Sequence, residues 1–515
     1  MRVIPLTPMP ARPERRAVIV VAIVFIAVNL VGLTRSPLSW VDEATLNDAA
    51  REWVTSGRIR SAVFSDVPAF SAGYYWQPPM QLLVSAGFYS VAGFGMWQTR
   101  IPPLLFGAAS LVMLGLILHR FRVSSTVIAI VTSLLAVDPL FSFLARSGRM
   151  DTMCLFFLLV AIHCSLRAVD TSRAVWSVAA GMAIGAAGMS HPIAVGMSAG
   201  LILAHALRLR ARPLLTLLLI ASAAVLPLLW VSFAWFSGGW SAFTAQFLQH
   251  GSDHLVSSSM LQRLSDEASR YLRDYARAPF VPFIHLVALV MFVRTAWQRR
   301  HEDSMILILC LVSAFVFNVL FMTKEVGFYV LYPGAIAVMM LGVVVSDAER
   351  DMRAMVRYAV RSVVAVLAVI LFVVGPGARL ALTVAQWTQR DPDVLKNAVE
   401  RAVPRGARVF GDGLLWYAAH DLGYDFTVDD YYMDKAYPHR RERRAAEVDY
   451  LILEKKQTRR ANLSACSLVD SITVTAPSLL GVGRSDTLYA MYVFRTFHRT
   501  EGRGSSVEPV TTSTP

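Results

Sequence analysis

The 515-residue sequence has few charged residues: 17% are Asp, Glu, Lys or Arg, whereas 55% are hydrophobic. Soluble domains carry about 25% charged residues, so a chain made only of soluble domains is excluded, as is a disordered chain. Cysteine is also scarce. Four cysteines with no CxxC pair exclude a disulfide scaffold and a CxxC metal or redox site. The composition therefore indicates a polytopic membrane protein with a smaller water-soluble part.

Apolar segments of about 20 residues, the length that crosses a bilayer, recur through most of the chain. They predict an all-α membrane bundle of about eleven transmembrane helices. Ser190-His191-Pro192 is interpreted as a turn between two short helices, with one re-entrant hairpin as the alternative. The predicted spans are 17–34, 101–118, 124–143, 152–168, 174–189, 192–207, 213–236, 279–296, 304–322, 326–346 and 358–375.

Basic residues are unevenly distributed around these spans. With the N-terminus in the cytoplasm, the cytoplasmic segments hold most of the net charge of +13, and the loops on the other side are balanced. This is the positive-inside pattern, whereas a nucleic-acid-binding surface concentrates charge on one soluble face. We therefore predict a multi-pass inner (plasma) membrane protein with an uncleaved N-terminal anchor and no nucleic-acid partner.

Three regions follow from this organisation. Residues 1–375 are predicted to form the transmembrane domain, with long outer loops at about 35–100 and 237–277. The odd number of spans places residues 376–500 outside the cytoplasm. Residues 501–515 are rich in Ser, Thr and Gly and are predicted to be disordered.

The region 376–500 has apolar runs of strand length rather than span length. Such runs, together with a helix opened by Asp-Pro, predict a small extracytoplasmic α/β domain. No glycine-rich loop follows a strand, so nothing indicates a nucleotide-sugar site. The predicted elements are strands at 408–410, 449–453 and 488–494 and a helix at 391–402.

The first outer loop opens with an acidic pair, Asp42 and Glu43, in the first turn of a predicted amphipathic helix. Adjacent helix residues point apart, so only one should face a site, and we choose Asp42. A carboxylate at the membrane surface can act as a general base. The alternative is structural: Ser39 as N-cap with an acid completing a capping box.

Aromatic residues crowd the place where this loop returns to the membrane. Tyr75, Trp76 and Gln77 precede Pro78 and Pro79, a pair suited to a first helical turn. We predict that the first three contact substrate, as a platform for a sugar ring or lipid head group. The alternative is an aromatic belt at the membrane interface.

Two arginines and an aspartate lie between two apolar spans on the outer side: Arg146, Arg149 and Asp151. The arginine fork matches phosphate oxygens, and ionisable residues at membrane depth indicate function. The alternative is an Arg–Asp pair that closes a short loop.

Four further polar residues are candidates for substrate or phosphate binding. His191 lies on the outer side, at the turn between two predicted short helices. Lys324 lies at the outer ends of two predicted spans, and Tyr332 follows it in the chain. Lys324 could contact a phosphate. The alternative is that it forms an ion pair with Glu325 that neutralises both charges. His250 and His254 have a spacing used by metals on helices, but the Gly and Ser between them favour a solvated loop.

In their order and sidedness, these motifs resemble the GT-C glycosyltransferases, most closely the protein mannosyltransferase and aminoarabinose (lipid A) transferase group. The resemblance covers about residues 17–346. Its motifs are Asp42-Glu43-Ala44, the Pro78-Pro79 return, Arg100-Ile101-Pro102, Arg149-x-Asp151, and Lys324 with Tyr332-Pro333.

The resemblance implies a reaction. A hexosyl or pentosyl group would pass from a polyprenyl-phosphate donor to a hydroxyl of an extracytoplasmic lipid, glycan or protein, in a single inverting displacement. A carboxylate would take the acceptor proton, and cations would stabilise the leaving phosphate. The residues so assigned are Asp42, Glu43 and Asp151 as catalytic groups and Arg149, Arg146 and Lys324 as phosphate ligands.

One motif departs from the family. The aminoarabinose transferases carry Glu-Lys before the return proline, where this chain has Trp76 and Gln77. A metal-binding acid and a phosphate-binding lysine are therefore missing from this motif. A divalent metal is compatible with the resemblance, but no ligand set follows from the sequence.

Two other classes are open. A transporter or flippase of lipid-linked saccharides needs ionisable residues along a midplane path, and the spans are nearly free of them. A non-catalytic anchor for the outer α/β domain would not need eleven spans and two long outer loops.

Overall fold

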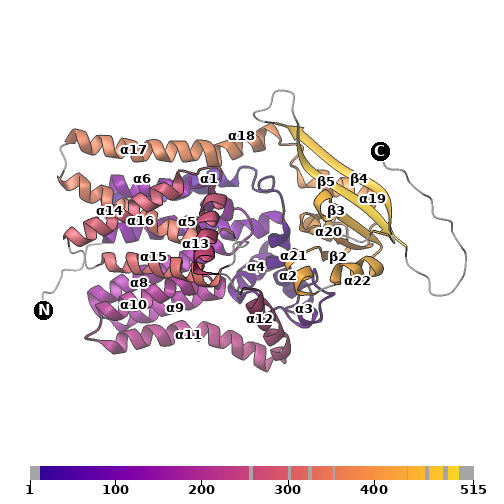
Figure 1. Cartoon of the computed structure of the whole chain (residues 1–515), viewed down its shortest axis with the longest axis horizontal. Coiled ribbons are helices and arrows are strands. Elements are labelled where there is room, and N and C mark those ends of the chain that lie inside the picture. Colours follow the sequence, from indigo (N-terminus) through magenta and orange to yellow (C-terminus); the bar gives the residue numbers. More distant parts are fainter. Residues whose placement is uncertain are drawn as a thin grey trace, which may run out of the picture.

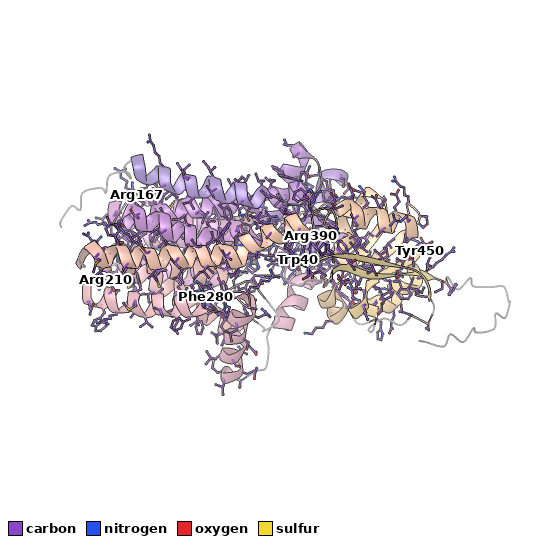
Figure 2. All side chains as sticks on the ribbon, turned by 90° about the horizontal axis from the view of Figure 1, so that it is seen from above. Trp40, Arg167, Arg210, Phe280, Arg390 and Tyr450 are labelled. Atoms are coloured by element: carbon purple, nitrogen blue, oxygen red, sulfur yellow. The ribbon has the colours of Figure 1, made fainter. Side chains whose placement is uncertain are left out.

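The structure is a computed structural model. A helical bundle occupies one end of its long axis, and a domain with a β-sheet occupies the other (Figure 1). Figure 2 shows Arg167 and Arg210 at the far end of the bundle, and Trp40 and Arg390 near its junction with the C-terminal domain. We call the end of the bundle that meets the C-terminal domain the domain end. The structure describes residues 12–254, 259–299, 303–322, 327–351, 354–437, 439–458, 463–464, 466–478 and 485–497.

Seven helices of the described part are long and apolar enough to cross a membrane, and four shorter apolar helices accompany them. Each predicted span holds one of the eleven, which confirms the polytopic α-helical class. The seven are α5 (Met96–Arg120), α8 (Asp151–Thr171), α11 (Pro213–Phe236), α14 (Val281–Arg299), α15 (Ser304–Phe321), α16 (Leu331–Asp351) and α17 (Ala354–Phe372). The shorter four are α1 (Arg12–Leu30), α6 (Ser125–Ala136), α9 (Ala174–Ser190) and α10 (Ala194–Arg208).

The predicted span 124–143 is broken in the structure. α6 ends at Ala136, and a short helix, α7 (Pro139–Leu144), begins after Asp138. The Asp138 carboxylate accepts a hydrogen bond from the Phe141 backbone N–H at 2.9 Å, and a proline occupies the first turn. An N-cap followed by proline starts a new helix. The prediction of one continuous span is wrong, because it followed the apolar residues and did not take Asp138-Pro139 as the start of a new helix.

Helices also fill the two long loops. The first loop holds α2 (Val41–Ser56), α3 (Pro68–Ala72) and α4 (Pro79–Ala92). α2 is the helix predicted there, but it is not amphipathic as predicted, because Glu43, Asn47, Asp48 and Glu52 are buried together with its apolar residues. The second holds α12 (Trp240–His254) and α13 (Met260–Asp274). α12 runs through residues 250–254, so the solvated loop predicted there is wrong. A single Gly and Ser did not outweigh the helix-forming residues before them.

The C-terminal domain has a five-stranded sheet in the order β2-β1-β3-β5-β4. The first three strands are parallel, and β5 pairs antiparallel with β3 and β4. The predicted strands and helix are all present, whereas β2 and β4 were not predicted. The strands are β1 (Arg408–Gly411), β2 (Asp425–Val428), β3 (Tyr450–Glu454), β4 (Cys466–Pro477) and β5 (Ser485–Thr496). The helices are α19 (Pro392–Ala402), η2 (Gly413–Leu415), α20 (Trp416–Asp421), α21 (Tyr431–Ala436), α22 (Arg440–Glu447) and α23 (Lys455–Thr458).

The two parts are joined by a helix and by a common apolar core. α17 continues through a π-helical turn, η1 (Val373–Gly377), into α18 (Ala378–Ala385), so the predicted boundary after residue 375 falls inside a helical run. Phe64 and Phe70 of the first loop share one buried cluster with Trp416 of the C-terminal domain. The C-terminal domain therefore rests directly on the segment that carries α2.

Candidate active site

α2 carries Asp42 in its first turn, at the domain end of the bundle. The helix begins at Val41, and Trp40 before it has an extended backbone and no side-chain cap hydrogen bond. The Ser39 hydroxyl is buried without a hydrogen-bond partner among the described residues. The capping-box alternative is therefore wrong, because Ser39 does not cap this helix.

Arg149 joins two carboxylates. Its Nε donates to Asp151 Oδ2 at 2.7 Å, and its Nη1 donates to Asp42 Oδ2. The Asp151 side chain is fully buried, whereas the Asp42 side chain is 31% exposed. The Arg–Asp pair of the structural alternative thus forms, but it has Asp42 as a third member. Of the two carboxylates, Asp42 is the one that a substrate can reach.

The surroundings set the charge of these groups. Burial raises the pKa of Asp42 above the ordinary aspartate value, Arg149 opposes the increase, and Asp151 adds to it. Burial lowers the pKa of Arg149, but the two carboxylates outweigh burial and the net shift is upward. Asp42 is therefore a stronger proton acceptor than a free aspartate, beside a permanent cation.

Aromatic rings enclose the guanidinium group. The Arg149 Cζ atom lies 5.6 Å from the ring centre of Trp40 and 5.0 Å from that of Phe328. The Phe143 ring lies 5.8 Å from Trp40 and 5.5 Å from Phe328, measured between centroids. Apolar walls strengthen the attraction between a cation and a bound anion. The sequence analysis missed these rings, because they meet only through segments that are distant in the chain.

Two predicted substrate-binding residues lie near Asp151. The Tyr332 hydroxyl is 3.5 Å from the Asp151 backbone oxygen, at the limit of a hydrogen bond. His191 packs edge-on against Tyr329, with ring centroids 5.0 Å apart, and its Nδ1 accepts a hydrogen bond from the Ile193 N–H. Burial, opposed by Asp151, lowers the pKa of His191 to about 4. Both side chains are almost fully buried, so they support the cluster from its inner side.

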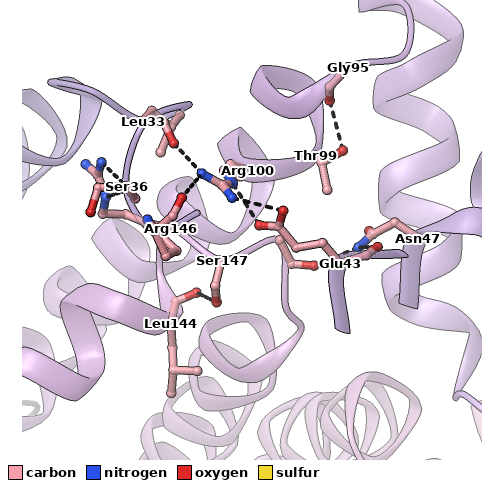
Figure 3. Close-up of polar contacts among 12 residues, drawn as sticks. Leu33, Ser36, Glu43, Asn47, Gly95, Thr99, Arg100, Leu144, Arg146 and Ser147 are labelled. Carbon is pink, nitrogen blue, oxygen red and sulfur yellow. Dashed lines mark hydrogen bonds and ion pairs between the residues drawn. The ribbon is translucent and has the colours of Figure 1, made fainter. Parts of the chain in front are cut away.

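Glu43 faces away from this cluster. Its carboxylate accepts two hydrogen bonds from Arg100, from Nε at 2.7 Å and from Nη2 at 2.9 Å, and neither side chain is exposed. Arg100 Nη1 donates to the Leu33 carbonyl at 2.7 Å (Figure 3). The structure thus places Glu43 at Arg100 and not at the cluster, and its catalytic role stays a prediction. The pair fixes α2 to α5 and to the end of the first span.

Arg146 is likewise held by buried contacts. Its guanidinium is fully buried, and its hydrogen bonds within the described residues go to backbone carbonyls of α1 and of the segment that follows it. Figure 3 shows Arg146 beside one of these acceptors, Ser36. Its acceptors are the carbonyls of Asn29, Val31, Gly32 and Ser36. Because these donors are engaged by buried carbonyls, the structure does not place Arg146 at the cluster, and its phosphate-binding role stays a prediction.

A polar network fixes the Arg149 loop to α2 and α4. Asn47 donates to the Gly148 carbonyl at 2.8 Å and accepts from Gln81 at 2.9 Å and from Ser85 at 3.0 Å. Gly148 has a φ of +60°, and a Cβ there would lie 2.8 Å from the Thr99 methyl group, so a side chain is excluded. In the sequence, this network could have been recognised only from the polar residues Asn47, Gln81 and Ser85 on the inner faces of α2 and α4.

Gln246 holds the loop that precedes α4. Its Nε2 donates to the carbonyls of Ala69 and Gly73, both at 2.7 Å, and its Oε1 accepts from the N–H groups of Tyr75 and Trp76 at 2.8 and 2.7 Å. The sequence analysis did not identify it, because a lone glutamine in an apolar helix carries no motif.

The Tyr75 ring is buried between α11 and α12, where it packs on Trp230 and Phe243. The prediction that Tyr75 offers a platform to substrate is therefore wrong. The Trp76 ring lies 6.5 Å from that of Phe247 and is partly exposed, as is Gln77. For these two residues, substrate contact stays a prediction.

Two predicted ligands cannot be placed at the cluster. Lys324 lies outside the described residues, and the described structure gives only the backbone of His250, within α12. Within the described ranges, no group of three or more His, Cys, Asp or Glu side chains is arranged to hold a metal ion. Asp42, Arg149 and Asp151 therefore form the centre of the candidate site.

A family model matches part of this chain, and solved structures share its fold. Residues 76–235 match the family described as dolichyl-phosphate-mannose-protein mannosyltransferase, and the whole chain has the GT-C fold of membrane glycosyltransferases. The resemblance seen in the motif order is thereby confirmed.

Among individual proteins, the chain is 31% identical over 112 residues to YycA of Bacillus subtilis (strain 168), a match that covers 22% of this chain and 16% of that protein. Its structure is similar to ArnT from Cupriavidus metallidurans bound to undecaprenyl phosphate, with a TM-score of 0.64 and 16% identity over 95% of this chain and 99% of that one. It is also similar to the oligosaccharyltransferase AglB from Archaeoglobus fulgidus in complex with an inhibitory peptide and a dolichol-phosphate. There the TM-score is 0.55 and the identity 11%, over 87% and 70% of the two chains.

Proposed function

We propose that this protein transfers a sugar from a polyprenyl-phosphate donor to a hydroxyl group of an extracytoplasmic acceptor, with inversion at the anomeric carbon. The observation that carries the proposal is the exposed Asp42 carboxylate beside the buried, doubly paired Arg149. A proton acceptor next to a fixed cation suits an attack by a hydroxyl and the departure of a phosphate. The lipid phosphates bound by ArnT and AglB support the donor class.

The proposed reaction is a single displacement. The acceptor oxygen bonds to the anomeric carbon, the bond from that carbon to the phosphate oxygen breaks, and Asp42 takes the hydroxyl proton. Arg149, held by Asp151, stabilises the charge that develops on the leaving polyprenyl phosphate. Lys324 is proposed as a second phosphate contact. In this proposal the domain end of the bundle faces away from the cytoplasm, in the inner membrane.

The test is a donor panel. The purified chain is incubated with undecaprenyl phosphates that carry mannose, glucose, galactose or 4-amino-4-deoxy-arabinose, and with a lipid, glycan and protein extract from cells that lack the gene. Mass spectrometry measures free undecaprenyl phosphate and the mass added to the acceptor. Release of undecaprenyl phosphate by wild type but not by Asp42→Asn supports the proposal. Equal release by both proteins contradicts it.

A further inference from the structure

A turn of the C-terminal domain meets the start of α2. η2 packs on α2, and an added Cβ at Gly413 would lie 2.4 Å from the Val41 Cα and 2.9 Å from its backbone nitrogen. Val41 directly precedes Asp42. The absence of a side chain at Gly413 therefore sets how close the C-terminal domain comes to the candidate catalytic carboxylate.

This contact is clamped along the same helix. Asp48, fully buried on α2, accepts a hydrogen bond from Trp416 Nε1 at 3.3 Å, three residues after Gly413. Asp48 also accepts from the backbone N–H groups of Ala62 and Val63 at 2.6 and 3.0 Å. One carboxylate thus ties together α2, the first outer loop and the C-terminal domain.

A second clamp lies at the far side of the loop. Arg440, on α22, donates to both carboxylate oxygens of Asp66 at 2.6 and 3.1 Å, and both side chains are buried. The Val428 N–H donates to the Val63 carbonyl at 3.0 Å. Lifting the C-terminal domain to make room at Gly413 would strain these bonds.

The part that can give way is the start of α2 before Glu43, since Glu43 itself is held by Arg100. The first N–H groups of a helix have no intrahelical partners, and the residue before this helix, Trp40, makes no side-chain cap hydrogen bond. A methyl group at position 413 would need about 1 Å more space to reach ordinary contact with the Val41 Cα. That displacement would fall on Asp42 and on its contact with Arg149.

We infer that Gly413 is a positioning residue for the transfer reaction: through Val41 it holds Asp42 at Arg149. The C-terminal domain is then part of the catalytic apparatus and not only a cover for it. This inference rests on the proposed role of Asp42. It concerns the placement of the proton acceptor and not the binding of the donor.

The main experiment compares Gly413→Ala with Gly87→Ala. Gly87 lies in α4, and an added Cβ there would meet nothing within 4 Å. The rate is measured against pH with the donor of the panel above that wild type consumes fastest, and undecaprenyl phosphate binding is measured in parallel. We expect Gly413→Ala to be about 10- to 100-fold slower, with binding within two-fold of wild type. We expect Gly87→Ala to match wild type.

The pH profile separates positioning from general damage. Asp42 faces Arg149 and, beyond it, Asp151, with Glu43 next to it on the helix. If Asp42 moves away from Arg149, it loses the charge that lowers its pKa, so the acid limb of the rate profile moves to higher pH. A wild-type rate and acid limb in a folded Gly413→Ala protein would overturn the inference. The inference would also be overturned if Gly413→Ala lost rate and donor binding equally while the acid limb of its rate profile stayed at the wild-type pH.

Two further measurements keep the test decisive. If Gly413→Ala does not fold, Trp416→Phe removes the indole N–H bond to Asp48, together with part of a buried ring, and is expected to show a smaller shift of the same sign. An unchanged limb and rate in that variant would overturn the inference. If Asp42→Asn retains full activity, the proposed function fails as well. If Asp42→Asn is inactive and Gly413→Ala is normal, only the positioning inference fails.

Discussion

Arg149 donates a hydrogen bond to the carboxylate of Asp42, which lies 107 positions earlier in the chain. The same guanidinium group donates to the buried Asp151 at 2.7 Å. A phosphate that approaches Arg149 therefore competes with Asp42 for its donors. In the proposed reaction, donor binding would loosen the Arg149–Asp42 contact and leave Asp42 free to accept a proton.

Asp42→Asn should abolish transfer while leaving expression and membrane insertion intact. The substitution keeps the size of the side chain but removes the proton acceptor, whose contribution is typically about 100- to 10,000-fold. The measurement is the rate of undecaprenyl phosphate release in the donor panel. Near-normal release would exclude Asp42 as the base.

Arg149→Lys should weaken donor binding while leaving the acceptor dependence little changed. Lysine keeps the charge but loses the fork that reaches two carboxylates and, in the proposed reaction, the donor phosphate. Undecaprenyl phosphate binding to the purified variants measures the effect.

Arg146→Lys is the matched comparison for Arg149→Lys. It should lower the melting temperature without a specific loss of affinity, because Arg146 bonds backbone carbonyls. If Arg149→Lys binds undecaprenyl phosphate as tightly as wild type, Arg149 does not belong to the donor site.

The pH dependence of the transfer rate should reflect the protonation of Asp42. Its pKa lies above the ordinary aspartate value because burial outweighs Arg149, so activity should fall as the pH drops through that raised pKa and Asp42 becomes protonated. Arg149→Gln removes the charge that lowers this pKa, so its acid limb should move to still higher pH. Profiles of kcat/KM against pH, which report pKa values of the free enzyme, test both statements. An unmoved limb in Arg149→Gln would rule out this electrostatic coupling.

Glu43→Gln should destabilise the fold, because it leaves the guanidinium of Arg100 as an unpaired buried charge. Breaking a buried ion pair typically costs about 3–5 kcal/mol. Thermal unfolding in detergent measures the loss. The neighbouring Asp42→Asn is the control, since Asp42 is partly exposed and its loss should change stability far less. Equal melting temperatures for the two variants would show that the Glu43–Arg100 pair is not a structural clamp.

Gln246→Leu should loosen the loop before α4. The substitution removes the partners of two carbonyls and two N–H groups, and each buried polar group left unpaired costs about 1–3 kcal/mol. Hydrogen exchange of residues 69–78 should rise. Gln262→Leu is the control, because Gln262 is exposed on α13. Unchanged exchange in Gln246→Leu would mean that other contacts hold the loop.

The acidic pair shows how far the sequence could lead. Helical spacing predicted that Asp42 and Glu43 point apart, and the structure shows one at Arg149 and the other at Arg100. The sequence could not show which of the two had a buried partner, because that depends on where α5 packs. Arg146 and Arg149 raise the same problem: both lie in one short segment, and only the fold decides that Arg146 donates to the Ser36 carbonyl and Arg149 to Asp42.

Local chemistry alone determined the apolar spans, the existence of helix α2 and three of the five strands, because hydrophobic periodicity and cap residues act over a few positions. It also brought Asp42 and the Arg149-x-Asp151 motif forward as candidates. Tertiary structure decided which carboxylate is exposed, which arginine is engaged by backbone carbonyls, and that a glycine of the C-terminal domain touches the start of α2. These outcomes depend on contacts between distant segments, which form only when the whole bundle packs.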